Sequence, residues 1–186
     1  NTTIIFDTVY QMVSDGICRL TGYSTPQAAW SSLLQSSKKI GIKVNAMGGR
    51  CICTHVELAY AVARHLTAAG ISAENIIIWD RLSTELEKGG YTVQKNGSGI
   101  KCYGTDSNYE SSLETSGTVG TCFSTIIARQ CDALINIPVL KDHDLSGVSL
   151  GLKNFYGAIH NPNKYHDNGC DPYIADLNCH PHIKTK

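Results

Sequence analysis

The sequence has few charged residues and no excess charge of either sign. Asp, Glu, Lys and Arg make up 17% of its 186 residues, below the roughly 25% that is usual for soluble domains. Sixteen basic residues balance sixteen acidic ones. The chain therefore has no basic field that would steer it to nucleic acid or to an anionic membrane, and we do not expect nucleic acid among its partners.

Long apolar runs and the common ligand-binding motifs are also missing. The longest apolar stretches, such as 76–79, have the length of a strand, far short of the roughly 18 residues of a membrane-spanning helix. The dinucleotide fingerprint GxGxxG, the phosphate loop GxxxxGK[ST] and CxxC repeats do not occur. We therefore expect no transmembrane segment, and no motif assigns a cofactor. The first residue is Asn1, with no signal peptide in view.

Cysteine, in contrast, is plentiful. The eight cysteines could be buried or free thiols, disulfides or metal ligands, and composition does not fix the redox compartment. A Cys51-x-Cys53 pair is weak evidence for a metal or redox site, although a nearby Arg50 could lower a thiol pKa. The remaining cysteines are Cys18, Cys102, Cys122, Cys131, Cys170 and Cys179.

The spacing of hydrophobic residues predicts alternating helices and strands. This alternation indicates one α/β domain over residues 1–186, with a mainly parallel sheet and helices on both faces. Segment 160–186 has no periodicity, and the chain reads as an incomplete fragment of a larger domain, truncated at both ends. Helices are expected at 8–20, 26–34, 54–69, 84–88, 121–130 and 146–156, and strands at 40–45, 75–80, 100–103 and 133–139.

Two of these helices have clear start signals. Thr25 can cap the second helix, and Pro26 suits its first position. Thr54 and Glu57 have the spacing of a capping box at the start of the third helix. We expect both helices to begin at these residues.

Ligands in open α/β sheets bind beyond the carboxyl ends of the strands. Asn45 ends one predicted strand and is followed by Gly48 and Gly49, whose backbone N–H groups could bind an anion or belong to a flexible connection. Asp80 ends a second strand. These positions make Asn45, Gly48 and Gly49 candidates for cofactor binding.

The third strand end leads into a lysine in apolar surroundings. Lys153 is the only charged residue between Asp144 and His160. Such a lysine either reaches back to solvent or is partly buried with a lowered pKa, as a nucleophile, a base or a cofactor anchor would be. His143, between two aspartates, is a candidate acid or base, or a surface histidine. His143 and Lys153 are therefore our candidate catalytic residues.

Potential metal ligands are frequent from His160 onward. Imidazole, thiolate and carboxylate together suit zinc, nickel or iron. The spacing fits no standard structural zinc motif, so a polar loop packed over the site is the alternative. The candidate metal ligands are His143, His160, His166 and Cys170.

Several long strings resemble the domain-of-unknown-function family 362. The match spans about residues 8–180 and implies a chain that continues beyond both termini. It also implies an exported protein, periplasmic or extracellular, because members often carry twin-arginine leaders. Some members carry a ferredoxin-like iron–sulfur domain, whose motif this chain lacks. The strings are IGIKVN (40–45), THVELAYAVARHLTAAG (54–70), NIIIWDR (75–81), CDALINIPVLKDHDLSGVSLGLKNFYGAIHNPNKYH (131–166) and DPYIADLN (171–178).

A more distant similarity is to the nickel-pincer lactate racemases. The pattern His143, Gly147-x-Ser149-x-Gly151-x-Lys153 resembles a segment in which a histidine precedes the lysine that holds the pincer cofactor, with further histidines near the nickel. Leu150 stands where those enzymes have a second glycine, and the region around His160 departs from their pattern. The similarity implies a shared scaffold, not racemisation.

Two functions remain open. The first is a metal- or cofactor-dependent enzyme for a small anionic substrate such as a hydroxy or keto acid. In that enzyme His143 would act as acid or base, Lys153 as cofactor anchor or electrostatic stabiliser, and His160 or His166 as a ligand. The second is a non-catalytic exported protein that serves as an assembly, structural or electron-transfer partner. An oligomer or a protein partner is compatible with both.

Overall fold

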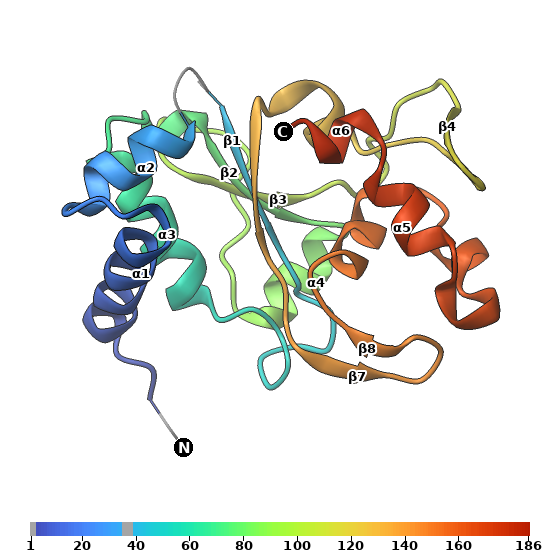
Figure 1. Cartoon of the computed structure of the whole chain (residues 1–186), viewed down its shortest axis with the longest axis horizontal. Coiled ribbons are helices and arrows are strands. Elements are labelled where there is room, and N and C mark those ends of the chain that lie inside the picture. Colours follow the sequence, from blue (N-terminus) through green and yellow to red (C-terminus); the bar gives the residue numbers. More distant parts are fainter. Residues whose placement is uncertain (1–2, 35–38) are drawn as a thin grey trace.

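A parallel sheet lies at the centre of the molecule. The computed structural model describes residues 3–34 and 39–186, and its main sheet has four strands in the order β3-β2-β1-β6 (Figure 1). Every neighbouring pair in this sheet is parallel. The α/β prediction is therefore confirmed. The strands are β1 (Ile40–Val44), β2 (Ile76–Asp80), β3 (Lys101–Gly104) and β6 (Ala133–Ile137).

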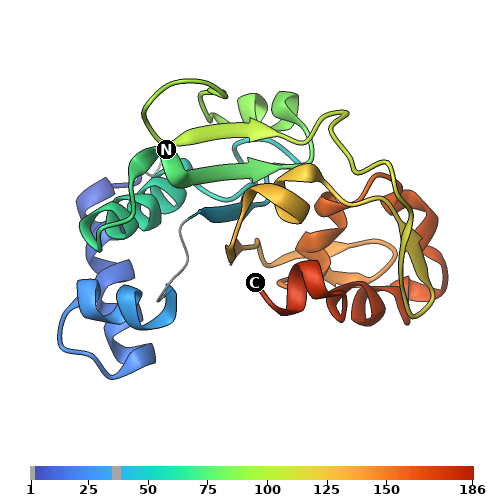
Figure 2. The ribbon, with the colours of Figure 1, turned by 90° about the horizontal axis from the view of Figure 1, so that it is seen from above.

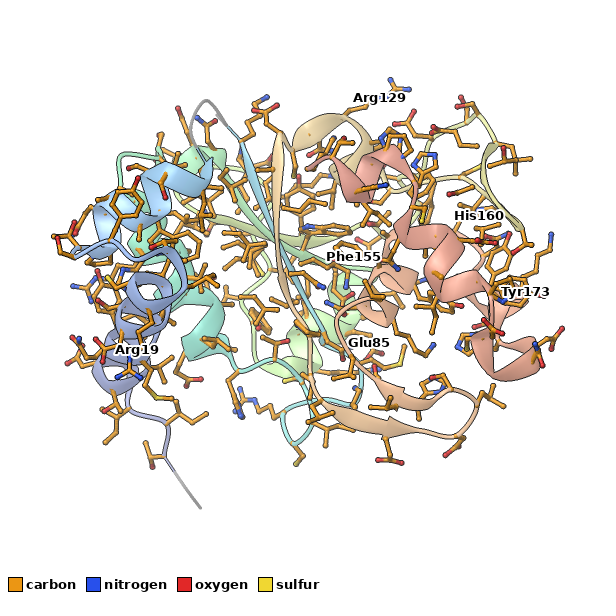
Figure 3. All side chains as sticks on the ribbon, in the orientation of Figure 1. Arg19, Glu85, Arg129, Phe155, His160 and Tyr173 are labelled. Atoms are coloured by element: carbon orange, nitrogen blue, oxygen red, sulfur yellow. The ribbon has the colours of Figure 1, made fainter. Side chains whose placement is uncertain are left out.

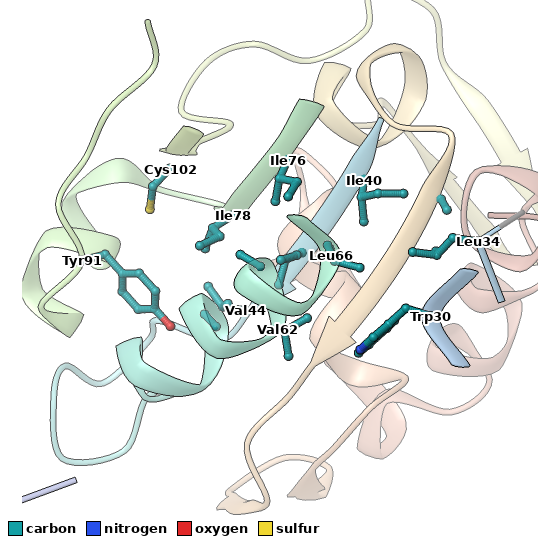
Figure 4. Close-up of a cluster of buried hydrophobic side chains, with 14 of the residues drawn as sticks. Trp30, Leu34, Ile40, Val44, Val62, Leu66, Ile76, Ile78, Tyr91 and Cys102 are labelled. Atoms are coloured by element: carbon teal, nitrogen blue, oxygen red, sulfur yellow. The ribbon is translucent and has the colours of Figure 1, made fainter. Parts of the chain in front are cut away.

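One face of the sheet packs against the N-terminal helices. Helices α1, α2 and α3 gather on this side, and Figure 2 shows them opposite the C-terminal part of the chain. Ile76 and Ile78 of β2 point into this core with α3 residue Leu66 (Figure 4). The helices are α1 (Phe6–Thr21), α2 (Pro26–Leu34), α3 (Val56–Ala68) and α4 (Ser83–Gly89).

The other face of the sheet is covered by short elements. Ile77 and Trp79 of β2 alternate with the residues of the first core and point into a second one, with Phe123 and Phe155. Burial on both faces explains the unbroken apolar strand. The covering elements are β4 (Glu114–Ser116), β5 (Val119–Thr121), a π-helix (Ile126–Gln130), β7 (Lys141–His143), β8 (Gly147–Ser149), 3₁₀ turns (Lys153–Ala158, Pro162–Tyr165, Asp167–Cys170), α5 (Tyr173–Asn178) and α6 (Pro181–Lys184). One further 3₁₀ turn, Ala73–Asn75, precedes β2.

The predicted helix over 146–156 is wrong. Strands β7 and β8 form an antiparallel hairpin there, and the next element is the 3₁₀ turn from Lys153. Gly147 has a φ of 71°, which a helix does not accept. The His143 ring also stabilises the hairpin turn, because its Nδ1 accepts hydrogen bonds from the backbone N–H groups of Leu145 and Ser146.

Two other expectations need correction. The helix predicted over 121–130 is limited to the π-helix, because β5 runs to Thr121 and Phe123 forms a bridge with Ile159. Segment 160–186 is not irregular but holds the short helices already described. Within residues 3–34 and 39–186, no helix combines the length and the apolar character that crossing a membrane requires.

The start of α3 shows why a local signal can mislead. The predicted capping box is absent, and His55 is the N-cap residue without a side-chain hydrogen bond. The Thr54 hydroxyl instead accepts from the N–H of Asn45 at 2.9 Å and donates to the carbonyl of Ile137 at 2.7 Å. Thr54 therefore links the ends of β1 and β6. The Thr25 cap is confirmed, since Thr25 Oγ1 accepts from the N–H of Ala28 at 3.3 Å.

Candidate functional site

A cavity of about 250 Å³ opens at the carboxyl ends of the parallel strands. Its wall combines the ends of β1 and β2 with the β7–β8 hairpin and the turns after it, as the rule for open α/β sheets predicts. Asn45, His143, Lys153 and His166, all named from the sequence, belong to the wall. The wall also contains Lys43, Asp80, Arg81, Glu85, Lys141 and Asn154.

A buried ion pair forms the floor of the cavity. Lys43 Nζ lies 2.6 Å from Asp80 Oδ1, and Asp80 also accepts hydrogen bonds from the N–H groups of Ala46 and Arg81. Burial lowers the pKa of Lys43, while Asp80 acts to raise it. Sequence reasoning singled out Asp80 as a strand end but missed Lys43. The signal was present, because Lys43 is the only charged residue in an otherwise apolar strand.

Gly157 allows the chain to approach this ion pair. A Cβ at this position would lie 2.8 Å from Asp80 Oδ1 and 2.9 Å from Lys43 Nζ, closer than side-chain atoms tolerate. Gly157 belongs to the same 3₁₀ turn as Lys153. A glycine is therefore needed to bring the Lys153 segment against the sheet.

A network of asparagines connects the sheet to the Lys153 segment. Asn154 Oδ1 accepts from Lys43 Nζ and from Asn45 Nδ2, both at 3.3 Å. Asn154 Nδ2 donates to Asn136 Oδ1 at 2.8 Å, and Asn136 donates in turn to the carbonyl of Gly151. These bonds fix the position of the segment relative to the ends of β1 and β6.

Lys141 orders the loop that follows β1. Its Nζ donates to Asn45 Oδ1 at 3.0 Å and to the carbonyl of Met47 at 2.7 Å. Burial lowers the pKa of Lys141, and Asp80 acts in the opposite direction. Gly48 lines an adjoining surface hollow rather than the cavity, and Gly49 lines neither.

Local hydrogen bonding explains the position of Gly49. Its N–H is directed to the carbonyl of Ala46 at 3.4 Å within the loop, so it is not turned toward the cavity. The two glycines have φ angles of 98° and 69°, which shape the loop. Of the four residues expected to bind a cofactor, Asn45 and Lys153 are thus the two that the structure brings to the cavity.

His143 has a fixed ring orientation. Because Nδ1 accepts the two N–H bonds of the hairpin turn, the neutral ring carries its proton on Nε2. Burial lowers the pKa of His143, and the charge of Lys153 lowers it further. At neutral pH, His143 is therefore an uncharged hydrogen-bond donor in the cavity wall.

Lys153 and His166 are in direct contact. Lys153 Nζ lies 3.0 Å from His166 Nε2, and His166 Nδ1 lies 3.0 Å from the carbonyl of Pro162. A carbonyl can only accept, so Nδ1 is the protonated nitrogen and Nε2 accepts from the lysine. Burial lowers the pKa of Lys153, while the Cys170 thiol acts to raise it. Burial and then the charge of Lys153 lower the pKa of His166.

Lys153 has no ion-pair partner within residues 3–34 and 39–186. Among the described residues, no carboxylate lies within 4.0 Å of its amine, which instead sits 4.1 Å from the ring centroid of Tyr156. Only 8% of Lys153 is exposed. The snorkelling alternative does not describe this lysine, because its amine contacts His166 inside the cavity wall.

The side chain of His160 does not line the cavity, although its backbone carbonyl accepts a hydrogen bond from Arg81 of the wall at 3.4 Å. His160 Nδ1 accepts from the N–H of Cys122 at 3.0 Å, because the bridge between Phe123 and Ile159 directs the chain toward β5. Figure 3 shows His160 well apart from Glu85, a residue of the cavity wall. Cys170 is buried beside Lys153 but is not part of the wall.

The eight cysteines are free thiols in the structure. Cys51 is exposed and Cys53 is buried, and burial raises the pKa of Cys53 although the charges of Lys141 and Arg50 oppose this. The raised pKa disfavours the reactive thiolate. For Cys53, burial thus outweighs the lowering of the thiol pKa that was expected from Arg50.

Comparison with known proteins gives a family but no function. A search of curated proteins finds no match to this chain. The family model described as "Domain of unknown function (DUF362)" matches residues 40–184, a span that includes the whole sheet and every residue of the cavity wall. The chain therefore belongs to the DUF362 family.

Proposed function

We propose that this chain is a metal- or cofactor-dependent enzyme that acts on a small anionic substrate such as a hydroxy or keto acid. The observation that carries the proposal is the Lys153 amine, which has no carboxylate partner among the described residues and lies 3.0 Å from His166 Nε2 in a cavity wall. A lysine with a lowered pKa is suited to hold a cofactor covalently or to stabilise negative charge.

The charge of the cavity supports an anionic ligand. Four cationic side chains and two carboxylates line it, a net charge of +2 with neutral histidines. One of these cations is neutralised by Asp80, whereas Lys141 and Lys153 have only uncharged hydrogen-bond partners among the described residues. Its volume of about 250 Å³ is below the roughly 300–1,000 Å³ of pockets for drug-sized ligands. Both properties favour a small carboxylate or phosphate.

The two histidines offer different chemistry. His143 presents Nε2–H, so it can donate a hydrogen bond to a developing oxyanion, as a neutral imidazole does in other enzymes. The Nε2 lone pair of His166 accepts from Lys153 in this structure, and it can take a proton from a substrate once the lysine amine turns to the bound anion. We therefore assign the donor role to His143 and the base role to His166. This assignment refines the expectation that His143 alone acts as acid and base.

The cavity provides one histidine suited to bind a metal. His166 Nδ1 donates to a backbone carbonyl, the arrangement that orients metal-bound histidines. Its Nε2 lies against Lys153 in the cavity wall. His143 fits less well, because a metal at Nε2 would displace the proton to Nδ1, where two N–H groups already donate. A nickel, zinc or iron cofactor would therefore be held by Lys153 and His166, and would supply Lewis acidity for the substrate.

Purification of the protein from its native source tests the cofactor part. Intact mass spectrometry and elemental analysis are expected to give a mass increment at Lys153, a transition metal, or both. Lys153→Arg should abolish the increment, and Lys164→Arg, an exposed lysine nearby, should retain it. An unmodified Lys153 without a transition metal would refute this part.

Ligand binding tests the substrate class separately. Calorimetric titration with lactate, pyruvate and inorganic phosphate is expected to show binding that weakens at least about tenfold in Lys153→Met, because a hydrogen bond to a charged group contributes about 1.5–3 kcal/mol. The Lys164→Met variant should bind as the wild type does. If none of the three anions binds, the anionic substrate class is wrong.

Export remains a proposal based on the family resemblance. We infer that the protein is exported to the periplasm or to the extracellular space, and fractionation of its native host tests this. Recovery in the cytoplasmic fraction alone would contradict it.

A further inference from the structure

We propose that Glu114, His180 and His182 bind one divalent transition-metal ion, with zinc the best fit. One ligand atom from each of these residues lies within 4.8 Å of the other two, and no other three potential ligands come this close together within residues 3–34 and 39–186. The site lies outside the cavity assigned above, whose wall contains none of the three. It therefore does not depend on the proposed function.

The separations are close to those of a tetrahedral site. Glu114 Oε1 lies 3.1 Å from His182 Nε2, and Glu114 Oε2 lies 3.5 Å from His180 Nε2. Tetrahedral zinc with bonds of about 2.0–2.1 Å places its ligand atoms about 3.3 Å apart. These two distances are to different oxygens of the carboxylate, so a single Glu114 oxygen that serves as the ligand has to move closer to one of the rings, from a separation of at most 4.8 Å. The two rings have only to close a gap that is at most 4.8 Å.

Neighbouring contacts hold the imidazoles in place. Phe123 packs on both rings, with centroid distances of 4.2 Å to His180 and 5.1 Å to His182. His180 Nδ1 accepts from the N–H of His182 at 3.2 Å. Metal binding at Nε2 would place the ring proton on Nδ1 and break this one hydrogen bond. His143, in contrast, would lose two such bonds. The His180–His182 pair is therefore the better metal-binding candidate.

The site is accessible to an ion. The side chain of His180 is 6% exposed, whereas those of Glu114 and His182 are 33% and 24% exposed. An ion could enter from the side of Glu114 and retain water in a fourth position. Two imidazoles and one carboxylate are a known zinc ligand set, and the imidazoles disfavour calcium and magnesium, which prefer oxygen.

A bound ion would join two distant parts of the chain. Glu114 begins β4, while His180 and His182 flank the start of α6, and 68 residues separate Glu114 from His182. The neighbouring Asp176 already bonds Thr118 of the same region through Oδ2 at 2.7 and 2.6 Å. The metal would strengthen this existing connection between the β4–β5 hairpin and the C-terminal helices.

Cobalt substitution provides the test, because the free cysteines would also bind zinc. The wild-type protein, stripped with a chelator and with its thiols blocked by alkylation, is titrated with CoCl₂. We expect one equivalent to bind at this site, with visible d–d bands and without a thiolate charge-transfer band, in addition to any equivalent that His166 holds in the cavity. Glu114→Gln and His182→Ala, both partly exposed positions, should weaken cobalt binding at least about tenfold, as loss of metal-site residues does.

Two control variants separate this site from other histidines. His55→Ala changes an exposed histidine, and His166→Ala removes the histidine proposed to hold a metal in the cavity, so both should keep the equivalent that binds at Glu114, His180 and His182. Circular dichroism verifies that each variant folds. Binding that persists unchanged in both Glu114→Gln and His182→Ala, binding lost entirely in His166→Ala, or no binding by the wild type would overturn the proposal.

Discussion

Removal of one member of the Lys43–Asp80 pair should strongly destabilise the fold. Only 1% of the Lys43 side chain and 10% of the Asp80 side chain are exposed. In Lys43→Met the carboxylate keeps two backbone N–H bonds but loses its cation, and in Asp80→Asn the ammonium keeps no counter-charge. Breaking a buried ion pair in this way costs about 3–5 kcal/mol in the free energy of unfolding.

Urea denaturation and thermal unfolding measure this cost. For a chain of this size, each kcal/mol shifts the melting temperature by about 2–4 °C, so each single variant should melt at least about 6 °C below the wild type. Trp79 fluorescence is a suitable probe, because Lys43 Nζ lies 5.5 Å from its ring centroid. The double variant Lys43→Met/Asp80→Asn should recover part of the loss, with a coupling energy of about 0.5–3 kcal/mol.

The exposed pair Lys88–Glu85 is the matched control. Its lysine side chain is 66% exposed, so Lys88→Met should cost less than about 1 kcal/mol. If both single variants at the buried pair cost as little as this control, or if their effects simply add in the double variant, the reasoning is refuted. Lys43 and Asp80 would then be independent polar residues, and the floor of the cavity would not depend on their attraction.

Three further changes test other parts of the structure. Gly157→Ala should lower the free energy of unfolding by about 1–3 kcal/mol through overpacking, while Gly16→Ala, with nothing within 4 Å of the added Cβ, should not; equal stability in a urea titration would contradict this. Thr54→Val leaves the Asn45 N–H and the Ile137 carbonyl unpaired and should cost about 1–3 kcal/mol, whereas Thr54→Ser should be much milder in the same assay. The pKa values of His143 and His166 are lowered from 6.5, so the unfolded chain binds protons first on acidification. The contribution of these two histidines to stability should therefore be complete above pH 6.5 and be lost progressively below it. A pH series in which His143→Gln/His166→Gln has the same slope as the wild type would disprove this.

The local sequence pattern is sufficient to predict the sheet and the helices that cover its first face. A continuous apolar run such as 76–80 and the helical spacing of apolar residues over 56–68 are distinct sequence patterns. Each pattern can be recognised from residues only a few positions apart. The location of the site also follows from the sequence, because ligands of such sheets bind at the carboxyl ends of the strands. Lys153 was singled out because a charged residue in apolar surroundings is itself a local signal, and His143 and Asn45 because they lie at strand ends; all three line the cavity.

The other features of the fold and of the cavity depended on contacts between segments that are distant in the sequence. Thr54 has the local signature of a helix cap, yet it bonds β1 and β6, because the carbonyl of Ile137, 83 positions further along the chain, lies within reach. Segment 146–156 has helix-compatible hydrophobicity, but the turn bonds to His143 and the left-handed Gly147 favour a hairpin. Likewise, the pairing of Lys43 with Asp80, of Lys153 with His166, and of Glu114 with the two C-terminal histidines joins residues from separate elements. Hydrophobic periodicity indicates which side of a helix or strand is buried. To predict a hydrogen bond or ion pair between distant segments, one must also know where the partner lies in space, and a single sequence does not contain this information.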